Sequence, residues 1–292
     1  MTVKKLRTRH HTVVLSRSAG GDVGITIFLI ILGAIMFLPL YYVVMQSFKP
    51  LDELFYYPPK FYVINPTWDN YTDLFTLMSE SWVPFSRYIF NTVFITFCGT
   101  FGNLVLSSLC AYALSKIPFP GRKGCFWLVE KSLMIGSTVG GVITFILISW
   151  LGWMDTYLAL IIPAWASTLG LYLMKQFMDS SITNSILESA RLDGAGEFRI
   201  FWSIAMPMVK PAWLTLIIYS FQGLWNTGAS TYIHSEELKT LNYAMTQVLS
   251  AGIVRSGAQA ASGVIMMMIP IIVFIVSQSK IIETMGTSGM KD

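Results

Sequence analysis

One polar segment interrupts the long apolar runs of this sequence, and its charged side chains are of the kind that bind a partner in water. It runs from Glu188 to Pro207, ESARLDGAGEFRIFWSIAMP, and its charges include Glu188, Arg191, Asp193 and Arg199. Apolar residues recur at helical spacing on both sides of its glycine-rich centre, namely Ile182, Ile186 and Ala190 before it and Phe198, Phe201, Trp202 and Ala205 after it. The pattern predicts two short helices joined by a glycine turn, with the charges facing water.

Other residue types that carry chemistry are scattered rather than grouped. Cys98, Cys110 and Cys125 have no paired spacing, which indicates neither a disulfide framework nor a metal motif. His234 is a lone histidine, so we expect no metal there. The sequence has no phosphate-binding loop of the form GxxxxGKS or GxxxxGKT. We therefore expect no catalytic residue, metal or cofactor in this chain.

The composition places the chain in a membrane. Hydrophobic residues make up 54% and charged residues 12%, with a mean hydropathy of +0.58, which one soluble core of 292 residues cannot hide. About six runs reach the roughly 20 residues that cross a bilayer. They are Ile25–Phe48, Tyr88–Ser115, Ser132–Leu151, Tyr157–Phe177, Ala212–Thr227 and Ala258–Ile282. The predicted fold is all-α, a polytopic membrane protein with about six transmembrane helices.

The distribution of basic residues predicts three parts and their orientation. A basic cytoplasmic tail covers residues 1–24, a transmembrane domain with the hairpin at 182–207 covers 25–282, and a cytoplasmic tail covers 283–292. Fifteen of the twenty Lys and Arg residues flank the runs on one side, which puts both termini and the hairpin in the cytoplasm. The first run lacks a cleavage site and is expected to stay as a signal anchor. The basic tail suits anionic lipid headgroups better than nucleic acid.

The polar segment and its neighbours resemble a known family. Glu188-Ser189-Ala190, Asp193-Gly194-Ala195 and Ile204 to Pro207 are similar to the EAA coupling motif of binding-protein-dependent ABC importer permeases, with Ser189 and Met206 as conservative departures. Tyr88 to Arg122 and Tyr219 to Asn226 resemble the second and fifth spans of carbohydrate importer permeases, including the maltose-transporter subunit. The C-terminal stretch from Ile282 is similar to the oligosaccharide or aldouronate branch.

This resemblance implies the permease subunit of an ATP-driven carbohydrate importer in a bacterial inner membrane. The implied partners are a second permease, two ATPase subunits that bind ATP and Mg²⁺, and an extracellular or periplasmic sugar-binding protein. The motif positions that would couple to the ATPase are Glu188, Ser189, Ala190, Asp193, Gly194, Ala195 and Pro207. In the maltose-type permease the tail reaches between the ATPases, which implies contacts there for Ser288, Gly289 and Lys291.

The residues that would handle a substrate are open to two interpretations. Asn91, Gln222 and Asn226 offer hydrogen bonds and Trp225 a ring face, as a sugar path requires. Buried amides also bridge membrane helices, and tryptophans mark membrane interfaces. Two other functions stay open: an importer of the same architecture for a polyol or another solute, and a secondary carrier. The carrier is disfavoured because the central portions of the runs lack ionisable residues.

Overall fold

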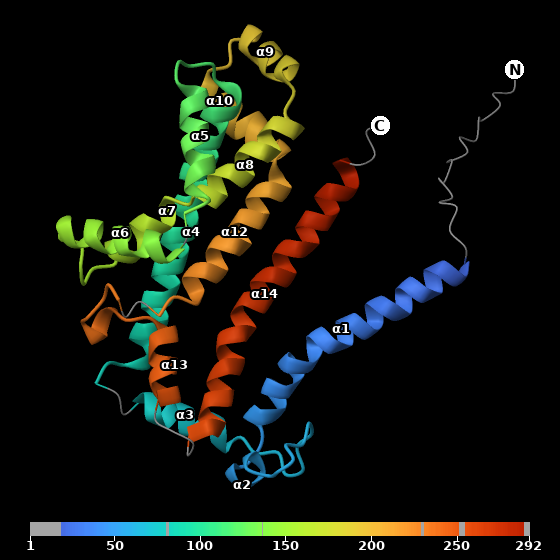
Figure 1. Cartoon of the computed structure of the whole chain (residues 1–292), viewed down its shortest axis with the longest axis vertical. Coiled ribbons are helices and arrows are strands. Elements are labelled where there is room, and N and C mark those ends of the chain that lie inside the picture. Colours follow the sequence, from blue (N-terminus) through green and yellow to red (C-terminus); the bar gives the residue numbers. More distant parts are fainter. Residues whose placement is uncertain (1–18, 80–81, 136, 229–230, 251–254, 289–292) are drawn as a thin grey trace, which may run out of the picture.

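The computed structural model describes residues 19–79, 82–135, 137–228, 231–250 and 255–288. Within those ranges the chain is helical and contains no β-strand (Figure 1). The α-helices are α1 Ala19–Ser47, α2 Leu51–Leu54, α3 Asp69–Ser79, α4 Phe85–Lys116, α5 Arg122–Ser132, α6 Ser137–Trp150, α7 Leu158–Trp165, α8 Thr168–Ser181, α9 Asn184–Leu192, α10 Glu197–Ile200, α11 Met206–Met208, α12 Lys210–Trp225, α13 Leu241–Ser250 and α14 Ser256–Ser288. A π-helical turn covers Phe201–Ala205, and a 3₁₀ turn covers Glu236–Leu238.

Helix α4 is the centre of the bundle. It packs against α7, α8 and α12, while α14 packs between α12 and α1 (Figure 1). Glycine allows the closest approach, because a Cβ on Gly102 would lie 2.0 Å from the indole nitrogen of Trp165. That nitrogen donates a hydrogen bond to the carbonyl of Cys98, which fixes α7 on α4. Helix α1 leans away from the bundle, and its apolar side chains from Val23 to Leu40 are exposed, as suits contact with lipid or another subunit.

The helical membrane architecture is confirmed. Four helical stretches of the described residues are long and apolar enough to cross a bilayer: Gly20–Ser47, Phe85–Lys116, Leu158–Ser181 and Ser256–Gln278. The pair Glu197–Met208 and Lys210–Trp225, bent by 83°, is a candidate fifth. The third predicted run, Ser132–Leu151, does not form one span-length helix here, because α5 ends at Ser132 and α6 has only 14 residues. At 1.5 Å per residue α6 covers about 21 Å of a roughly 30 Å hydrocarbon layer. The count of six spans stays a prediction.

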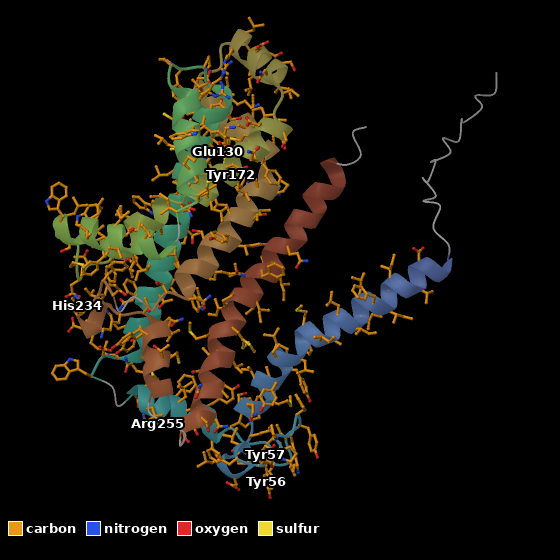
Figure 2. All side chains as sticks on the ribbon, in the orientation of Figure 1. Tyr56, Tyr57, Glu130, Tyr172, His234 and Arg255 are labelled. Atoms are coloured by element: carbon orange, nitrogen blue, oxygen red, sulfur yellow. The ribbon has the colours of Figure 1, made fainter. Side chains whose placement is uncertain are left out.

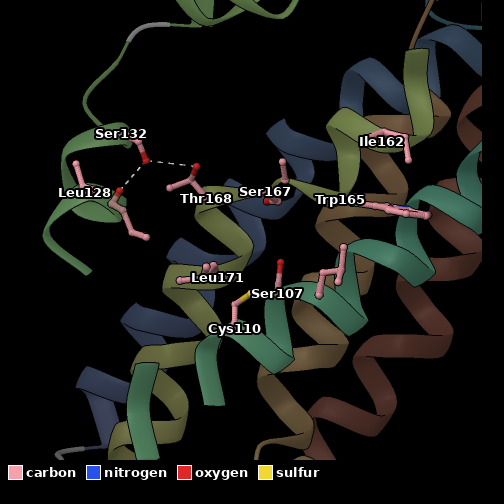
Figure 3. A pocket seen from close by; sticks show the side chains of 12 residues that line it. Ser107, Cys110, Leu128, Ser132, Ile162, Trp165, Ser167, Thr168 and Leu171 are labelled. Atoms are coloured by element: carbon pink, nitrogen blue, oxygen red, sulfur yellow. Dashed lines mark hydrogen bonds between the residues drawn. The ribbon is translucent and has the colours of Figure 1, made fainter. Parts of the chain in front are cut away.

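The span Leu158–Ser181 is broken between α7 and α8, where Ser167 caps α8 by accepting a hydrogen bond from the Gly170 amide at 3.0 Å. A groove of about 570 Å³ opens at this break between α4, α5 and α8 (Figure 3). The Ser132 hydroxyl donates to the carbonyl of Val129 at 2.8 Å and lies 3.4 Å from the hydroxyl of Thr168, which brings α5 and α8 together. The walls of the groove are mostly apolar.

The two ends of the bundle carry different short helices. Helices α9 and α10 lie at one end, which we call the hairpin end, and α2, α3 and α13 lie at the other, the loop end (Figure 1). Helix α14 runs through Ser288, so the predicted tail begins as a continuation of this helix. Gly289 and Lys291, predicted to contact an ATPase, lie outside the described residues.

Candidate functional site

The predicted turn of the hairpin is closed by backbone hydrogen bonds that need glycine. Helix α9 ends at Leu192, and Gly194 follows with a φ of +79°, the left-handed region that side-chain-bearing residues avoid. The Ala195 amide donates to the carbonyl of Ala190, and the Gly194 amide donates to the carbonyl of Arg191, each at 3.0 Å. This pair of bonds is a Schellman motif, which satisfies carbonyls at a helix end. The Asp193 side chain makes no hydrogen bond to any other residue in the described part of the chain, so the backbone alone closes the turn.

The apolar face of the hairpin differs from the predicted stripe. Leu187 and Ala190 of α9 are buried, but Ile186 is 40% exposed. After the turn Phe201 and Ala205 are buried as expected, whereas Phe198 and Trp202 are 69% and 43% exposed. Ile182 and Ala190 are buried as expected, so the prediction before the turn fails only at its middle position, where Leu187 faces inward in place of Ile186. The π-helical turn at Phe201–Ala205 changes the direction of later side chains.

The buried face anchors the hairpin to the ends of α4 and α8. Leu187, Ile200 and Phe201 share one apolar cluster with Tyr112 of α4 and Met178 of α8. The Phe201 and Tyr112 rings meet edge to face with centroids 5.5 Å apart. The hairpin is therefore a packed extension of the bundle.

Polar contacts tie the two halves of the hairpin together. Arg191 Nε donates to Glu197 Oε1 at 2.6 Å, and the Tyr112 hydroxyl donates to Glu197 Oε2 at 2.8 Å. The hydrogen bond with Glu197 raises the pKa of the Arg191 guanidinium. Sequence reasoning missed Glu197, whose only local signal is its place in the first turn of α10, where a carboxylate complements the helix dipole.

The outer surface of the hairpin combines exposed apolar and charged side chains. Leu192 is 89% exposed, and Phe198 and Ile186 are also open. Glu188 and Asp193 are exposed between them. Ser189 is exposed as well, and its hydroxyl donates to the carbonyl of Ser185 at 3.0 Å. A mixed apolar and charged surface on a rigid turn is suited to docking on a soluble protein.

Pro207 lies at the bend that sets the hairpin across the bundle. It is exposed in α11, and the chain turns by 83° between Glu197–Met208 and Lys210–Trp225. Pro211 follows in the first turn of α12, where its missing amide proton costs nothing. The Trp213 indole donates to the carbonyl of Met206 at 3.1 Å across the bend.

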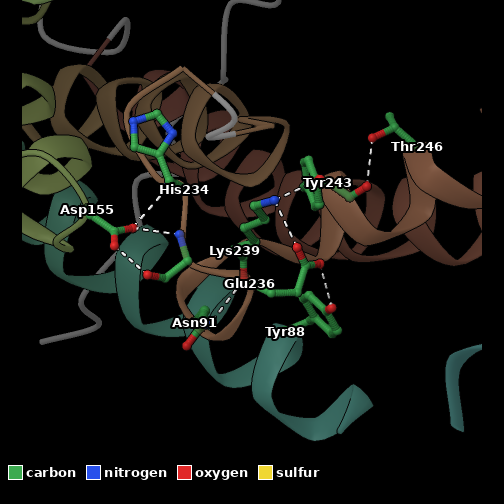
Figure 4. A network of polar contacts seen from close by, with 9 residues as sticks. Tyr88, Asn91, Asp155, His234, Glu236, Lys239, Tyr243 and Thr246 are labelled. Carbon is green, nitrogen blue, oxygen red and sulfur yellow. Dashed lines mark hydrogen bonds and ion pairs between the residues drawn. The ribbon is translucent and has the colours of Figure 1, made fainter. Parts of the chain in front are cut away.

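The Asn91 side chain bonds to the protein itself rather than facing an open path. It is fully buried, and Figure 4 shows it beside Lys239. Its amide nitrogen donates to the carbonyls of Glu237 and Lys239 at 2.8 and 2.9 Å, and its oxygen accepts from the Tyr157 hydroxyl at 2.7 Å. These three bonds use both donors and the acceptor of the amide. In this conformation Asn91 holds the 3₁₀ turn on α4, and a substrate could not reach it.

Trp225 is also enclosed, whereas Gln222 and Asn226 are not. The Trp225 side chain is buried in an apolar cluster, its nitrogen donates to the carbonyl of Met266 at 3.0 Å, and its ring stacks on Phe221. Gln222 in the last turn of α12 and Asn226, the residue that follows its end, are exposed, and the side-chain amide of Asn226 donates to the backbone carbonyl of Gln222 at 2.9 Å. A substrate role for Gln222 and Asn226 stays a prediction.

A second polar network, not foreseen from the sequence, organises the loop end (Figure 4). Asp155, which has a φ of +60°, accepts hydrogen bonds from the amides of His234 and Ser235 at 2.9 and 2.8 Å and from the Ser235 hydroxyl. These bonds hold the pKa of the Asp155 carboxyl below its usual range. Glu236 pairs with Lys239 at 2.8 Å and accepts from the Tyr88 hydroxyl.

Comparison with known proteins identifies the family. Residues 22–284 match the model of a binding-protein-dependent transport system inner membrane component. The chain is 31% identical over 245 residues to the polygalacturonan/rhamnogalacturonan transport system permease protein YtcP of Bacillus subtilis strain 168, covering 80% of this chain and 78% of that protein. It is 29% identical over 275 residues to the arabinooligosaccharides transport system permease protein AraQ of the same bacterium, covering 92% and 95%.

A solved structure has the same fold. It is the crystal structure of a bacterial ABC transporter involved in the import of the acidic polysaccharide alginate, matched with a TM-score of 0.73 and 21% identity over 90% of this chain and 98% of that chain. The chain belongs to the family of binding-protein-dependent inner-membrane transport components, as its motif predicted. It is an integral membrane permease of a class that lacks its own catalytic site and works with other transporter subunits and a substrate-binding protein.

Proposed function

We propose that this chain is the transmembrane subunit of an ATP-driven carbohydrate importer of the oligosaccharide type and forms half of the translocation pathway. The observation that carries the proposal is the family match across residues 22–284. The names of two relatives, which refer to polygalacturonan/rhamnogalacturonan and to arabinooligosaccharides, support the carbohydrate class. Exposed Gln222 and Asn226 on α12 supply uncharged hydrogen-bonding groups of the kind a sugar path needs.

The hairpin is the proposed docking element for the ATPase. Leu192 and Phe198 would enter an apolar groove on the ATPase, with Glu188 and Asp193 available for charged or hydrogen-bonding groups at its rim. Space around Gly194 supports this arrangement, because a Cβ there would meet no atom of this chain within 4 Å. The turn can therefore lie closely against another protein.

Movement of the ATPase would pass to the spans through the buried side of the hairpin. Leu187 and Ala190 pack on the cluster that includes α4 and α8, and Glu197 bonds to Tyr112 of α4. The 83° bend beside Pro207 sets this hairpin across α12, so a push on α9 acts on several spans at once. This rigid linkage is the proposed coupling path.

The proposed assembly contains a second homologous permease, two ATPase subunits and an extracellular sugar-binding protein. ATP and Mg²⁺ would bind in the ATPases, since the sequence here has no phosphate-binding loop. Docking requires the hairpin end to face the cytoplasm, and the excess of Lys and Arg flanking the spans on that side supports this orientation. Ser288, at the end of α14, and the following Gly289 and Lys291 would extend toward the ATPases.

Purification and reconstitution test the proposal. The tagged chain, expressed with its genomic neighbours, should co-purify with an ATPase and a second permease. Vesicles containing that assembly and its binding protein should take up carbohydrate only with ATP inside. Solute uptake driven by an ion gradient through the chain alone would contradict the proposal and favour a secondary carrier.

A further inference from the structure

A cavity is lined by residues of α1, α13 and α14. The parts of these helices that line it lie toward the loop end of the bundle, away from the hairpin formed by α9 and α10 (Figure 1). The volume of the cavity is about 590 Å³, within the range of roughly 300–1,000 Å³ typical of small-molecule sites. Helix α1 contributes Tyr42 and Gln46, α13 contributes Asn242 and Thr246, and α14 contributes Ser256 and its neighbours. The cavity therefore joins the leaning helix α1 to the rest of the bundle.

Two buried polar atoms of this cavity have no partner within the described residues. They are the side-chain oxygen of Gln46 and the hydroxyl of Ser256. Buried polar atoms are paired in the great majority of cases, so each unpaired atom calls for a bound molecule or water. Only two other side-chain atoms among the described residues share this condition, on Thr96 and Thr100, and neither residue lines this cavity. Gln46 and Ser256, which carry these two unpaired oxygens, both line this one cavity.

The remaining walls supply further neutral hydrogen-bonding groups and ring faces. The amides of Asn242 and Gln259 offer donors and acceptors. The Thr246 hydroxyl donates to the carbonyl of Tyr243 at 2.7 Å, which leaves its oxygen free to accept. Tyr42 and Phe55 add aromatic surface. Amides and hydroxyls around aromatic rings match the alternating hydroxyl and C–H surface of a sugar ring.

The cavity carries no charge among its described lining residues. The adjoining cleft differs, since Asp52, Asp69 and Asp73 line it together with Arg255. Figure 2 shows that Arg255 lies at the loop end of the bundle, where Tyr56 and Tyr57 also lie. An anionic ligand would find no cation in the cavity to repay the loss of its hydration, whereas a neutral ligand pays no such cost.

We propose that this cavity is a binding subsite for one uncharged, hydroxyl-rich ring of the transported carbohydrate, held by Gln46 and Ser256. The inference rests on the proposed function, because it takes the ligand to be the importer's cargo. It assigns the subsite to neutral sugar units and excludes uronate and phosphorylated units. The subsite lies at the end where cargo enters if the hairpin faces the cytoplasm.

Thiol protection measures occupancy without relying on transport. In the assembled transporter with Cys98, Cys110 and Cys125 replaced by Ala, Thr246→Cys places a reactive thiol in the cavity. Arabinotriose should slow its labelling by a neutral methanethiosulfonate reagent, and trigalacturonate should not. The matched control is Thr76→Cys, in the adjoining charged cleft, where labelling should be unchanged by either sugar. Protection by trigalacturonate, or no protection by arabinotriose, would overturn the proposal.

Uptake by variants separates a ligand role from a packing role. Gln46→Leu with Ser256→Ala removes the unpaired atoms, so folding should be retained. Loss of two hydrogen bonds should raise the half-saturating concentration of the neutral sugar about tenfold with little change in maximal rate. Ser277→Ala, the same change elsewhere on α14, is the control. A normal half-saturating concentration in the double variant would overturn the subsite, while ATP-driven uptake would still support the proposed function. Uptake without ATP would contradict the proposed function itself.

Discussion

Tyr112 and Glu197 are 85 positions apart in the sequence, and the phenol of the first donates a 2.8 Å hydrogen bond to the carboxylate of the second. The same carboxylate accepts from Arg191 across the glycine turn. One side chain thus joins both halves of the hairpin to the central helix α4. Any displacement of the hairpin must move α4 or break this bond.

Removing the Tyr112 hydroxyl should weaken coupling more than folding. In Tyr112→Phe the ring can still pack on Phe201, so we expect a stability loss of only about 1 kcal/mol. The ratio of carbohydrate imported to ATP hydrolysed should fall, because the hairpin loses its polar link to α4. Both quantities are measured in proteoliposomes, with Tyr172→Phe on α8 as the matched control. An unchanged ratio for Tyr112→Phe would refute the link.

Substitutions at Gly194 can show whether the turn needs a residue that adopts the left-handed conformation or needs room for the ATPase. Asn tolerates the left-handed region better than Ala, and Ala is smaller. If the ATPase groove lies against the turn, ATP-driven uptake should fall in the order Gly, Ala, Asn, and Gly194→Asp should abolish it with the protein still inserted. The opposite order for Ala and Asn would show that backbone conformation alone matters. Membrane content on immunoblots controls for insertion.

The fold and the hairpin were predictable for different reasons. In lipid every backbone polar group needs a partner within the protein, so long apolar runs must be helices wherever they cross, and this reasoning located α1, α4 and α14. Gly194 was predictable because a helix ending in a tight turn favours glycine. Periodicity failed for Ile186 and Trp202 because small shifts in helix rotation and a π-helical turn decide which side chains face inward.

Asn91 should matter for stability rather than for sugar affinity. In Asn91→Leu two carbonyls and the Tyr157 hydroxyl lose their partner at a buried site, which should cost about 2–4 kcal/mol. The midpoint of thermal unfolding in detergent should fall clearly. Asn65→Leu, at an exposed position, is the comparison and should change it little. A normal midpoint together with reduced sugar affinity would return Asn91 to the substrate path.

Asp155 predicts how the loop end responds to acid. The hydroxyl and amide of Ser235 and the amide of His234 hold the pKa of the Asp155 carboxyl low, so its stabilising effect is present above the unfolded value of about 3.9. This stabilising effect is lost as the pH falls through the lower pKa that the carboxyl has in the folded state. Asp155→Asn should therefore destabilise the protein at pH 7 by about 1 kcal/mol, a small value because the site is partly exposed, and the difference from the native chain should vanish in strong acid. Unfolding midpoints across pH test this, with Asp52→Asn as a control. A difference that persists in strong acid would contradict it.

Polar residues showed the limit of sequence reasoning at the candidate site. An amide in a span has the same local signature whether it bridges helices or binds cargo. Long-range contacts decided the matter for Asn91, whose carbonyl partners lie 146 and 148 positions away. Glu197 was missed for the same reason, since Tyr112 lies far from it in the sequence.

The exposed amides of α12 give the sharpest test of the substrate path. Gln222 and Asn226 are one turn apart, and their side chains face away from the chain's own core. If they line the pathway, Gln222→Leu with Asn226→Leu should lower the rate of carbohydrate uptake about thirtyfold, because two hydrogen-bonding groups of about 1 kcal/mol each are lost. ATPase activity stimulated by the loaded binding protein should persist, since the hairpin is unchanged. Thr215→Val, exposed on the same helix, is the control. Unaltered uptake in the double variant would assign both amides to contacts with lipid headgroups or the second permease.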